Sequence, residues 1–272
     1  MISLSLKKIS SITEGILHGS NLIIHDIMIN SKKIIPGSLF IALIGKKFDA
    51  HIFIKEAIKN GCVAIITQKK INYPISYIIV KNTSIALGKI ASWIRIFLNT
   101  KVIAITGSAG KTSVKDMTTS ILQTNKKIIS TIDNNNSNNI NVPITLLQLK
   151  KEHKYAIIEL GANTPGEILY TSHISKPNVI LINNIYHAHL EGFKSLLGVS
   201  KAKEEIFYGL QKNGIVILNL DSHHFSRWKK KIKNKKTIFF SIKKKKIVIF
   251  LLVILILIFI TLLLFYIHQM EK

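Results

Sequence analysis

The sequence predicts an α/β protein with two domains and an apolar C-terminal helix. From Lys101 onward, strand-like and helix-like segments alternate, which is typical of a parallel sheet with helices on both faces. A shorter series of strand-like and helix-like segments precedes Lys101. Near the end of the chain, the 21 residues 247–267 carry no charge, and they follow a run of lysines.

We expect the domain boundaries near residues 98 and 242. A chain of 272 residues is long enough for about two domains, here a small N-terminal α/β domain (1–98) and a central domain (99–242), with the tail at 243–272. The N-terminal domain is expected to contain strands 22–30, 38–43, 62–67 and 76–80 and helices 51–59 and 84–98. The central domain is expected to contain strands 102–106, 155–160, 179–183 and 215–220 and helices 112–124 and 195–210.

A glycine-rich segment joins strand 102–106 to helix 112–124, and this is the context in which a phosphate-binding loop occurs. Glycines let the backbone approach anionic oxygens, and a helix N-terminus offers unpaired N–H groups. A lysine there can reach terminal phosphates, and a hydroxyl can bind Mg²⁺. The spacing departs from the common G-x-x-x-x-G-K-[ST] pattern, because Ile105 stands where the first glycine would be. The predicted nucleotide-binding residues are Gly107, Ser108, Ala109, Gly110, Lys111, Thr112 and Ser113.

Polar residues follow the predicted strands of the central domain, where ligands of open parallel sheets bind. Glu159 ends an apolar strand and is well placed to hold Mg²⁺, although a surface acid or a helix cap would give the same pattern. His187 and His189 follow another strand end and suggest a metal or phosphate role. The loops 30–33 and 45–51 could hold an anionic ligand, or they could be ordinary solvated turns.

Composition argues against nucleic acid as a partner. The net charge is +24, but the lysines are spread along the chain without a basic and aromatic stripe, and isoleucine and asparagine are also abundant. An A/T-rich coding sequence produces this composition. A single cysteine, Cys62, fits a reducing compartment, and the first residues lack a secretory signal, so we expect a cytoplasmic protein.

Several linked blocks of residues resemble the Mur ligase family. They are PGSLFIALIGKKFDAH (36–51), TGSAGKTSVKDMT (106–118), NVPITLLQL (141–149), AIIELGAN (156–163), HLEGF (189–193) and KAKEEIF (201–207). The resemblance runs from Met1 to about Ser241. It is strongest to family members that join D-alanyl-D-alanine to UDP-MurNAc-tripeptide.

The resemblance implies an ATP-dependent peptide ligase of peptidoglycan precursor synthesis that proceeds through an acyl phosphate. It implies a partial P-loop-type ATPase domain in which Thr112 and Glu159 hold Mg²⁺ and Lys111 is catalytic. His189 matches a histidine of the family's second metal site, and Lys203 matches a lysine that family members carbamylate. It also implies that the N-terminal domain binds the UDP end of the substrate, with Ser31, Asp49 and His51 in the loops concerned. We expect a monomer.

Two positions depart from the family pattern. Lys32 stands where an arginine is usual, and it lacks the bidentate guanidinium. Asn141 replaces a glycine, and asparagine tolerates a left-handed backbone better than most residues.

The tail is the largest departure, because family members continue through more of the ATPase domain and a third domain. As a helix, 247–267 would span roughly 31 Å, enough for a bilayer core. A membrane anchor is one interpretation, and a frameshift within the codons of Lys243–Lys246 is the favoured one. Such a form is expected to have little or no ligase turnover.

Two alternatives to the ligase remain open. One is a membrane-anchored nucleotide-binding module without ligase activity, with the membrane contact made only by 247–267. The other is a basic P-loop ATPase associated with nucleic acid, which ranks last because no basic or aromatic stripe supports it.

Overall fold

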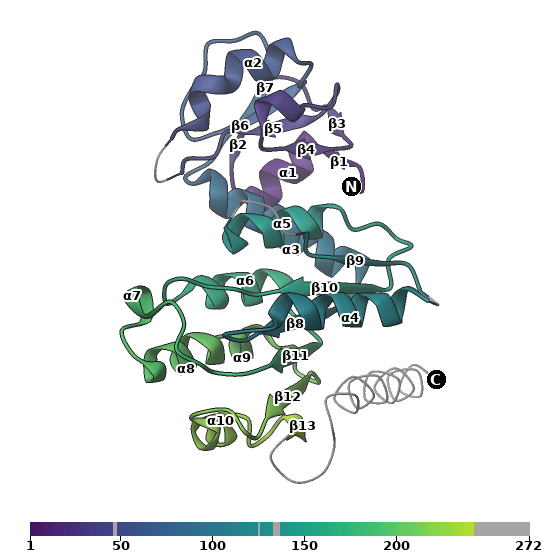
Figure 1. The fold of residues 1–272 in the computed structure, drawn as a ribbon. Coiled ribbons are helices and arrows are strands. Elements are labelled where there is room, and N and C mark those ends of the chain that lie inside the picture. The colour runs from purple at the N-terminus through teal and green to yellow at the C-terminus, as the bar shows by residue number, and fades with distance from the viewer. Residues whose placement is uncertain (46–47, 125, 133–136, 242–272) are drawn as a thin grey trace. The chain divides into compact units, whose positions relative to one another are not determined.

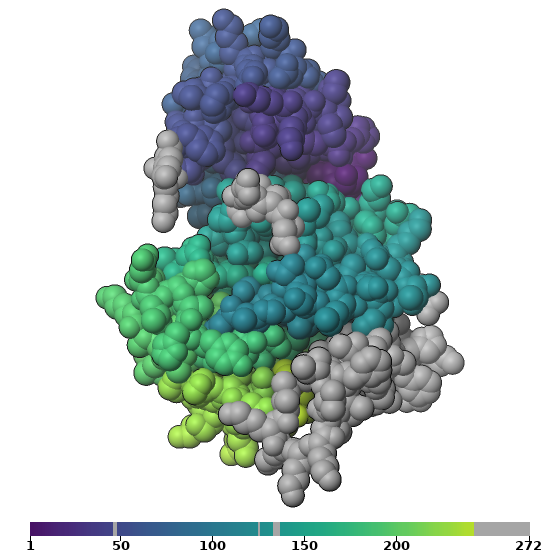
Figure 2. Space-filling model, in the orientation of Figure 1, coloured from purple at the N-terminus to yellow at the C-terminus, as the bar shows by residue number. Residues whose placement is uncertain are grey.

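The computed structural model describes residues 1–45, 48–124, 126–132 and 137–241. The chain divides into two compact units. The N-terminal unit comprises Met1–Thr100 with Pro143–Lys151, and the central unit comprises Lys101–Val142 with the residues from Glu152 onward. Side chains fill the space between the ribbons of each unit (Figure 2). The predicted α/β class is confirmed.

The N-terminal unit is built on a mostly parallel sheet of five strands in the order β2-β7-β6-β5-β4, with β2 antiparallel to β7 (Figure 1). A separate antiparallel pair joins β1 to β3. The strands are β1 (Leu4–Ser5), β2 (Ile16–His18), β3 (Ile23–Ile24), β4 (Ile27–Met28), β5 (Leu39–Ile41), β6 (Ala64–Thr67) and β7 (Ser76–Ile79). The helices are α1 (Leu6–Thr13), α2 (Ile54–Lys59) and α3 (Thr83–Leu98), with the 3₁₀ helices η1 (Ser31–Lys33) and η2 (Ala50–Phe53).

Side chains at the helix ends explain where several helices of this unit begin. Ser5 and Asn82 accept hydrogen bonds from the main-chain N–H groups of Lys8 and Ile85, which would otherwise lack partners in the first turns of α1 and α3. Asp49 does the same for η2. The core behind η2 and α2 contains Phe40, Ala42, Ala50, Ile54, Ala57, Cys62, Ile65 and Tyr77.

The single strand predicted at 22–30 is wrong. The segment forms β3 and β4, which belong to different sheets, because β3 pairs antiparallel with β1 whereas β4 pairs parallel with β5. The chain changes partners at His25 and Asp26.

Asn141 also differs from expectation. It lies in α5 (Asn138–Leu147), so its backbone is helical, and tolerance of a left-handed backbone does not explain the asparagine there.

The central unit is built on a fully parallel sheet of six strands in the order β13-β12-β11-β8-β10-β9. The strands are β8 (Lys101–Thr106), β9 (Ile128–Ser130), β10 (Tyr155–Glu159), β11 (Val179–Ile182), β12 (Ile215–Asn219) and β13 (Lys236–Phe240). The helices are α4 (Lys111–Gln123), α6 (Glu167–Ser175), α7 (Leu190–Phe193), α8 (Leu196–Glu204), α9 (Ile206–Gly209) and α10 (Phe225–Lys231).

Both faces of this sheet are covered, as its buried strands require. Val114 and Leu122 of α4 pack in one core cluster with Ile103, Ile105 and Ile157 of the sheet. Alternate side chains of a strand point to opposite faces, and α6 contacts β8 from the other side. The phosphate-loop segment therefore follows a strand that is buried over all of its residues except Lys101.

The single helix predicted at 195–210 is also wrong. It is divided into α8 and α9 at Glu205, whose carboxylate accepts hydrogen bonds from the N–H groups of Gly166 and Leu169 at the start of α6. In α9, Gly209 lies directly against the backbone of Ser172, where an added Cβ would be only 2.2 Å from the carbonyl oxygen. The break thus allows a close approach between α9 and α6.

Within the described ranges, we find no helix that combines the length and apolar character needed to cross a bilayer. Residues 243–272, with the lysine run and the apolar helix predicted for 247–267, lie outside these ranges.

Candidate functional site

The predicted site lies at the carboxyl end of the central parallel strands. β8 has β10 on one side and β11 on the other, so the loops that follow these three strands meet at one edge of the sheet (Figure 1). From β8 the chain passes first to β9, which lies beyond β10 on one side of β8. The later strand β11 lies on the other side of β8. A reversal of this kind creates the crevice in which open α/β sheets bind ligands.

The loop between β8 and α4 is closely packed, and each of its two glycines is required for a different reason. A Cβ on Gly107 would lie 3.1 Å from the Asn183 Cβ and 3.3 Å from the Asn184 nitrogen, so a side chain would push against the neighbouring loop. Gly110 has a φ of +70°, in the left-handed region, where glycine carries no steric penalty. It is the residue that turns the chain into α4.

The N-terminus of α4 presents donors to the edge of the sheet. The first hydrogen bond of the helix runs from the Val114 N–H to the Gly110 carbonyl at 3.0 Å, so the N–H groups of Lys111, Thr112 and Ser113 precede it. These groups and the helix dipole favour an anion. The Lys111 ammonium donates to the Ser108 carbonyl at 3.5 Å and thus stays over the loop.

Thr112 and Glu159 are in direct contact. The Thr112 hydroxyl donates to Glu159 Oε2 at 2.9 Å, and the Glu159 N–H donates to Thr131 Oγ1 at 3.0 Å. A hydroxyl and a carboxylate beside a phosphate-type loop form the oxygen donor set that Mg²⁺ takes together with phosphates. Among the described residues, no three histidine, cysteine, aspartate or glutamate side chains form a metal cage.

Lys203 lies on α8 with only 2% of its surface exposed. Burial, and then repulsion from Lys111, lower the pKa of its ammonium to about 8, while attraction from Glu159 opposes the shift. The field of both Lys111 and Glu159 reaches this amine, so the structure brings the three residues to one site. The burial of Lys203 excludes an ordinary solvated lysine at this position.

His189 stands at the start of α7 with a φ of +51°, an uncommon left-handed conformation for a side-chain-bearing residue. Its ring packs edge-on against Phe193 with the centroids 6.5 Å apart, and the Lys203 ammonium lies 6.0 Å from the centre of the same ring. α7 also approaches the loop after β10, since a Cβ on Gly192 would lie 1.9 Å from the Asn163 carbonyl oxygen. His189 and Lys203 are thus held around Phe193.

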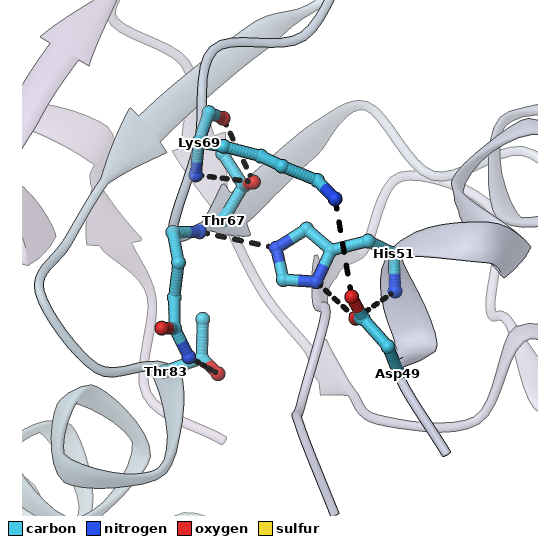
Figure 3. Close-up of polar contacts among 6 residues, drawn as sticks. Asp49, His51, Thr67, Lys69 and Thr83 are labelled. Atoms are coloured by element: carbon cyan, nitrogen blue, oxygen red, sulfur yellow. Dashed lines mark hydrogen bonds and ion pairs between the residues drawn. The ribbon is translucent and has the colours of Figure 1, made fainter.

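The three residues predicted for the N-terminal unit have their polar atoms in internal contacts. The Ser31 hydroxyl donates to Glu56 Oε2 of α2 at 2.5 Å. The His51 ring is enclosed: Nδ1 donates to the Asp49 carboxylate, and Nε2 accepts from the Gln68 N–H at 3.1 Å (Figure 3). The main-chain N–H of His51 also donates to Asp49 at 2.9 Å, and hydrogen bonding from His51 lowers the pKa of that carboxyl.

His51 is therefore positioned to hold the loop before η2 against the end of β6. Its side chain is 3% exposed, whereas that of Asp49 is 40% exposed. Lys69 lies beside the same carboxylate at 3.9 Å (Figure 3). Asp49 and Lys69, and not the His51 ring, are the members of this group that face solvent.

Two residues of the central site, Asn184 and Thr131, were not predicted as site residues from the sequence. Asn184 contacts the glycine-rich loop through its side chain, and Thr131 fixes the end of β10. Asn184 was visible as a polar residue after a predicted strand. Thr131 follows β9, which is too short and too exposed to give an apolar strand signal.

The strand, the glycine-rich loop, the helix N-terminus and the carboxylate on the next strand define a phosphate-loop domain. Comparison with family models agrees with this class: the Mur ligase middle domain matches residues 105–252, and the Mur ligase family catalytic domain matches residues 23–95. The chain belongs to the Mur ligase family.

Individual relatives cover most of this chain. The UDP-N-acetylmuramoyl-tripeptide–D-alanyl-D-alanine ligase of Buchnera aphidicola subsp. Acyrthosiphon pisum is 68% identical over 242 residues, which are 89% of this chain and 53% of the relative. The ligase of the same name from Escherichia coli K12 is 44% identical over 241 residues, with the same two shares. The chain thus spans about half the length of the curated relatives it matches.

Solved structures show the same fold. MurF from Acinetobacter baumannii superimposes with a TM-score of 0.84 at 34% identity, covering 88% of this chain and 53% of that chain. MurF ligase from Thermotoga maritima, solved in complex with ADP, gives a TM-score of 0.70 at 29% identity, covering 80% of this chain and 50% of the other.

Proposed function

We propose that this chain takes part in the ATP-dependent addition of D-alanyl-D-alanine to UDP-MurNAc-tripeptide, a step of peptidoglycan precursor synthesis. The names of the relatives supply the reaction. The observation in this chain that carries the proposal is the 2.9 Å hydrogen bond between Thr112 and Glu159 beside the glycine-rich loop. It joins the two oxygen ligands that a magnesium ion on a bound nucleotide needs.

The loop 107–113 is the proposed ATP site. Its support is the free helix N-terminus of α4, the lysine over the loop and the ADP complex of the Thermotoga maritima neighbour. Lys111 would contact the terminal phosphates, and Thr112 and Glu159 would hold Mg²⁺. ATP supplies the phosphate that converts the substrate carboxylate into an acyl phosphate, which an amine can attack.

Lys203 and His189 are proposed to complete the site for the carboxylate. A carbamate can form only on a neutral amine, and the lowered pKa of about 8 gives Lys203 a sizeable neutral fraction near physiological pH. The neutral amine would add to dissolved CO₂ and release one proton. The resulting carbamate would replace a buried cation with an anion that could bind a second metal ion. His189, held with Lys203 around Phe193, would be a ligand of the same ion.

The N-terminal unit is the proposed binding site for the UDP end of the substrate. Asp49 and the neighbouring Lys69 are partly exposed, while the His51 ring would act by fixing the loop that carries Asp49. Ser31 would contribute through η1, which its hydroxyl attaches to Glu56 of α2. We expect a cytoplasmic protein, since nucleotide-linked precursors are its proposed substrates, and we expect it to be a monomer.

The test is a set of calorimetric titrations of the purified 272-residue chain with MgATP and with UDP-MurNAc-tripeptide, followed by an assay of ADP release. Because the chain spans about half of its relatives, the assay is run alone and with the C-terminal half of the Escherichia coli ligase added. We expect both ligands to bind and the chain alone to release little or no ADP. With the C-terminal half added, we expect ADP release that requires both UDP-MurNAc-tripeptide and D-alanyl-D-alanine. MgATP binding without binding of the UDP substrate would contradict the ligase and leave a simple nucleotide-binding module.

A further inference from the structure

The segment after β11, Asn183–Tyr186, holds the glycine-rich loop by side-chain and main-chain contacts. Asn184 Oδ1 accepts hydrogen bonds from the N–H groups of both Ser108, at 3.1 Å, and Ala109, at 2.9 Å. Asn184 Nδ2 donates to the Ala109 carbonyl at 3.0 Å. One side-chain amide thus bonds three main-chain polar groups of Ser108 and Ala109.

We propose that Asn184 is a positioning residue that holds the loop in the shape required for nucleotide phosphates. This inference rests on the proposed ATP site. Longer phosphate loops hold their shape with their own backbone. In this chain, the segment that follows β11 would supply part of that support.

The length of the loop explains why such support is needed. The common loop has four residues between its glycines, whereas Gly107 and Gly110 are separated only by Ser108 and Ala109. A loop this short has few N–H groups of its own with which to enclose a phosphate. Since Asn184 occupies the N–H groups of Ser108 and Ala109, those from Gly110 onward are left to face the ligand.

The contacts around Asn184 indicate a fixed support and not a temporary occupant of the phosphate site. The Ser108 hydroxyl donates to the Tyr186 carbonyl at 3.1 Å and accepts from the Tyr186 N–H at 2.9 Å. Asn183 Nδ2 donates to the Ala109 carbonyl at 2.9 Å, and the Asn183 carbonyl accepts from Asn219 at 3.0 Å. The residues on both sides of Asn184 are thus attached to the same loop or to the neighbouring strand, besides the three hydrogen bonds of the Asn184 side chain itself.

The experiment compares wild type with Asn184→Ala in the full 272-residue chain. Calorimetry measures MgATP affinity, and ³¹P NMR at saturating MgATP measures the resonance of the bound β-phosphate. We expect about a tenfold loss of affinity, because several hydrogen bonds that shape the loop are removed. We also expect the bound β-phosphate resonance to move toward that of free MgATP, which a purely structural loss of stability would not cause.

Asn178→Ala is the matched control. Asn178 accepts a hydrogen bond from the Val102 N–H at 2.9 Å, so the same side chain makes the same kind of contact at the opposite end of β8 and β11. We expect this variant to lower the melting temperature but to keep MgATP affinity within about twofold and the β-phosphate resonance unchanged.

Each outcome decides a different claim. If wild type binds MgATP and Asn184→Ala keeps either its affinity or its bound β-phosphate resonance, the positioning role is wrong while the ATP site stands. If wild type does not bind MgATP, the proposed function fails first. If Asn184→Ala does not fold, Ser108→Ala decides instead. It removes the two hydrogen bonds between the hydroxyl and the Tyr186 main chain, and we expect about a threefold loss of affinity with the same direction of NMR shift, whereas no change overturns the inference.

Discussion

The Thr112 hydroxyl donates a hydrogen bond of 2.9 Å to the Glu159 carboxylate, although 46 residues separate the two positions in the chain. The contact arises because β8 and β10 pair in register, with Glu159 opposite Ile105, so the end of β10 lies beside the loop that follows β8. Thr131 fixes the Glu159 main chain from the neighbouring β9 segment. The Thr112 hydroxyl at the start of α4 and the Glu159 carboxylate at the end of β10 therefore lie side by side, and they are the pair that we propose as ligands of Mg²⁺.

We expect Glu159→Gln to reduce the Mg²⁺ affinity of the nucleotide complex by at least roughly tenfold. Glutamine keeps the size of the side chain and an oxygen for Thr112, so the change removes mainly the negative charge. The measurement is a titration of the MgADP complex with Mn²⁺, followed by electron paramagnetic resonance. Glu152→Gln, before the opposite end of β10 and paired with Lys127 at 3.0 Å, is the control that should leave Mn²⁺ binding unchanged. Equal Mn²⁺ affinity in wild type and Glu159→Gln would remove Glu159 from the metal site.

We expect Lys111→Ala to abolish measurable MgATP binding, a loss of roughly a hundredfold or more, because a charge-assisted contact to the phosphates disappears. Calorimetry measures the affinity, and circular dichroism checks that the fold is retained. Lys126→Ala, just beyond the other end of α4, removes an exposed lysine and should bind MgATP as wild type does. An unchanged affinity in Lys111→Ala would mean that the loop is not a phosphate site.

We expect Lys203 to form a carbamate whose amount rises between about pH 7 and pH 8.5 at constant dissolved CO₂. Its amine has a lowered pKa of about 8, so about a quarter is neutral at pH 7.5, and the neutral fraction grows with pH. The measurement is ¹³C NMR with labelled bicarbonate. Lys203→Arg should lose the carbamate resonance, and Lys201→Arg, at an exposed position of the same helix, should keep it. A resonance that survives in Lys203→Arg would assign the carbamate to another amine.

The sequence predicted the parts of the site that depend on local order. Val102–Thr106 is apolar, and the residues after it carry the glycines, the lysine and the helical spacing, so strand, loop and helix could be placed within one or two residues. Glu159 was found for the same reason, as a charged residue that ends an apolar strand.

Contacts between strands were beyond this kind of reasoning. Asn184 was visible after β11, but alternation of strands and helices does not specify that β11 lies next to β8, and only that order brings Asn184 to the loop. The strand predicted at 22–30 failed for a related reason, since pairing partners in two different sheets divide it. His51 was predicted as a binding residue from the family resemblance, and the 16 residues between it and its partner Gln68 hid the bond that encloses its ring.

We expect His51→Ala to lower the free energy of unfolding by about 2 kcal/mol and to weaken binding of UDP-MurNAc-tripeptide in parallel. The substitution leaves the partly buried Gln68 N–H without its acceptor and releases Asp49 from the ring, so the loop before η2 loses its attachment to β6. Urea denaturation and calorimetry measure the two effects. His25→Ala removes an exposed ring that contacts only the Ser3 hydroxyl among the described side chains, at 2.8 Å, and should change neither quantity. A large loss of affinity in His51→Ala at unchanged stability would show that the ring touches the ligand itself, and the positioning interpretation of His51 would then be wrong.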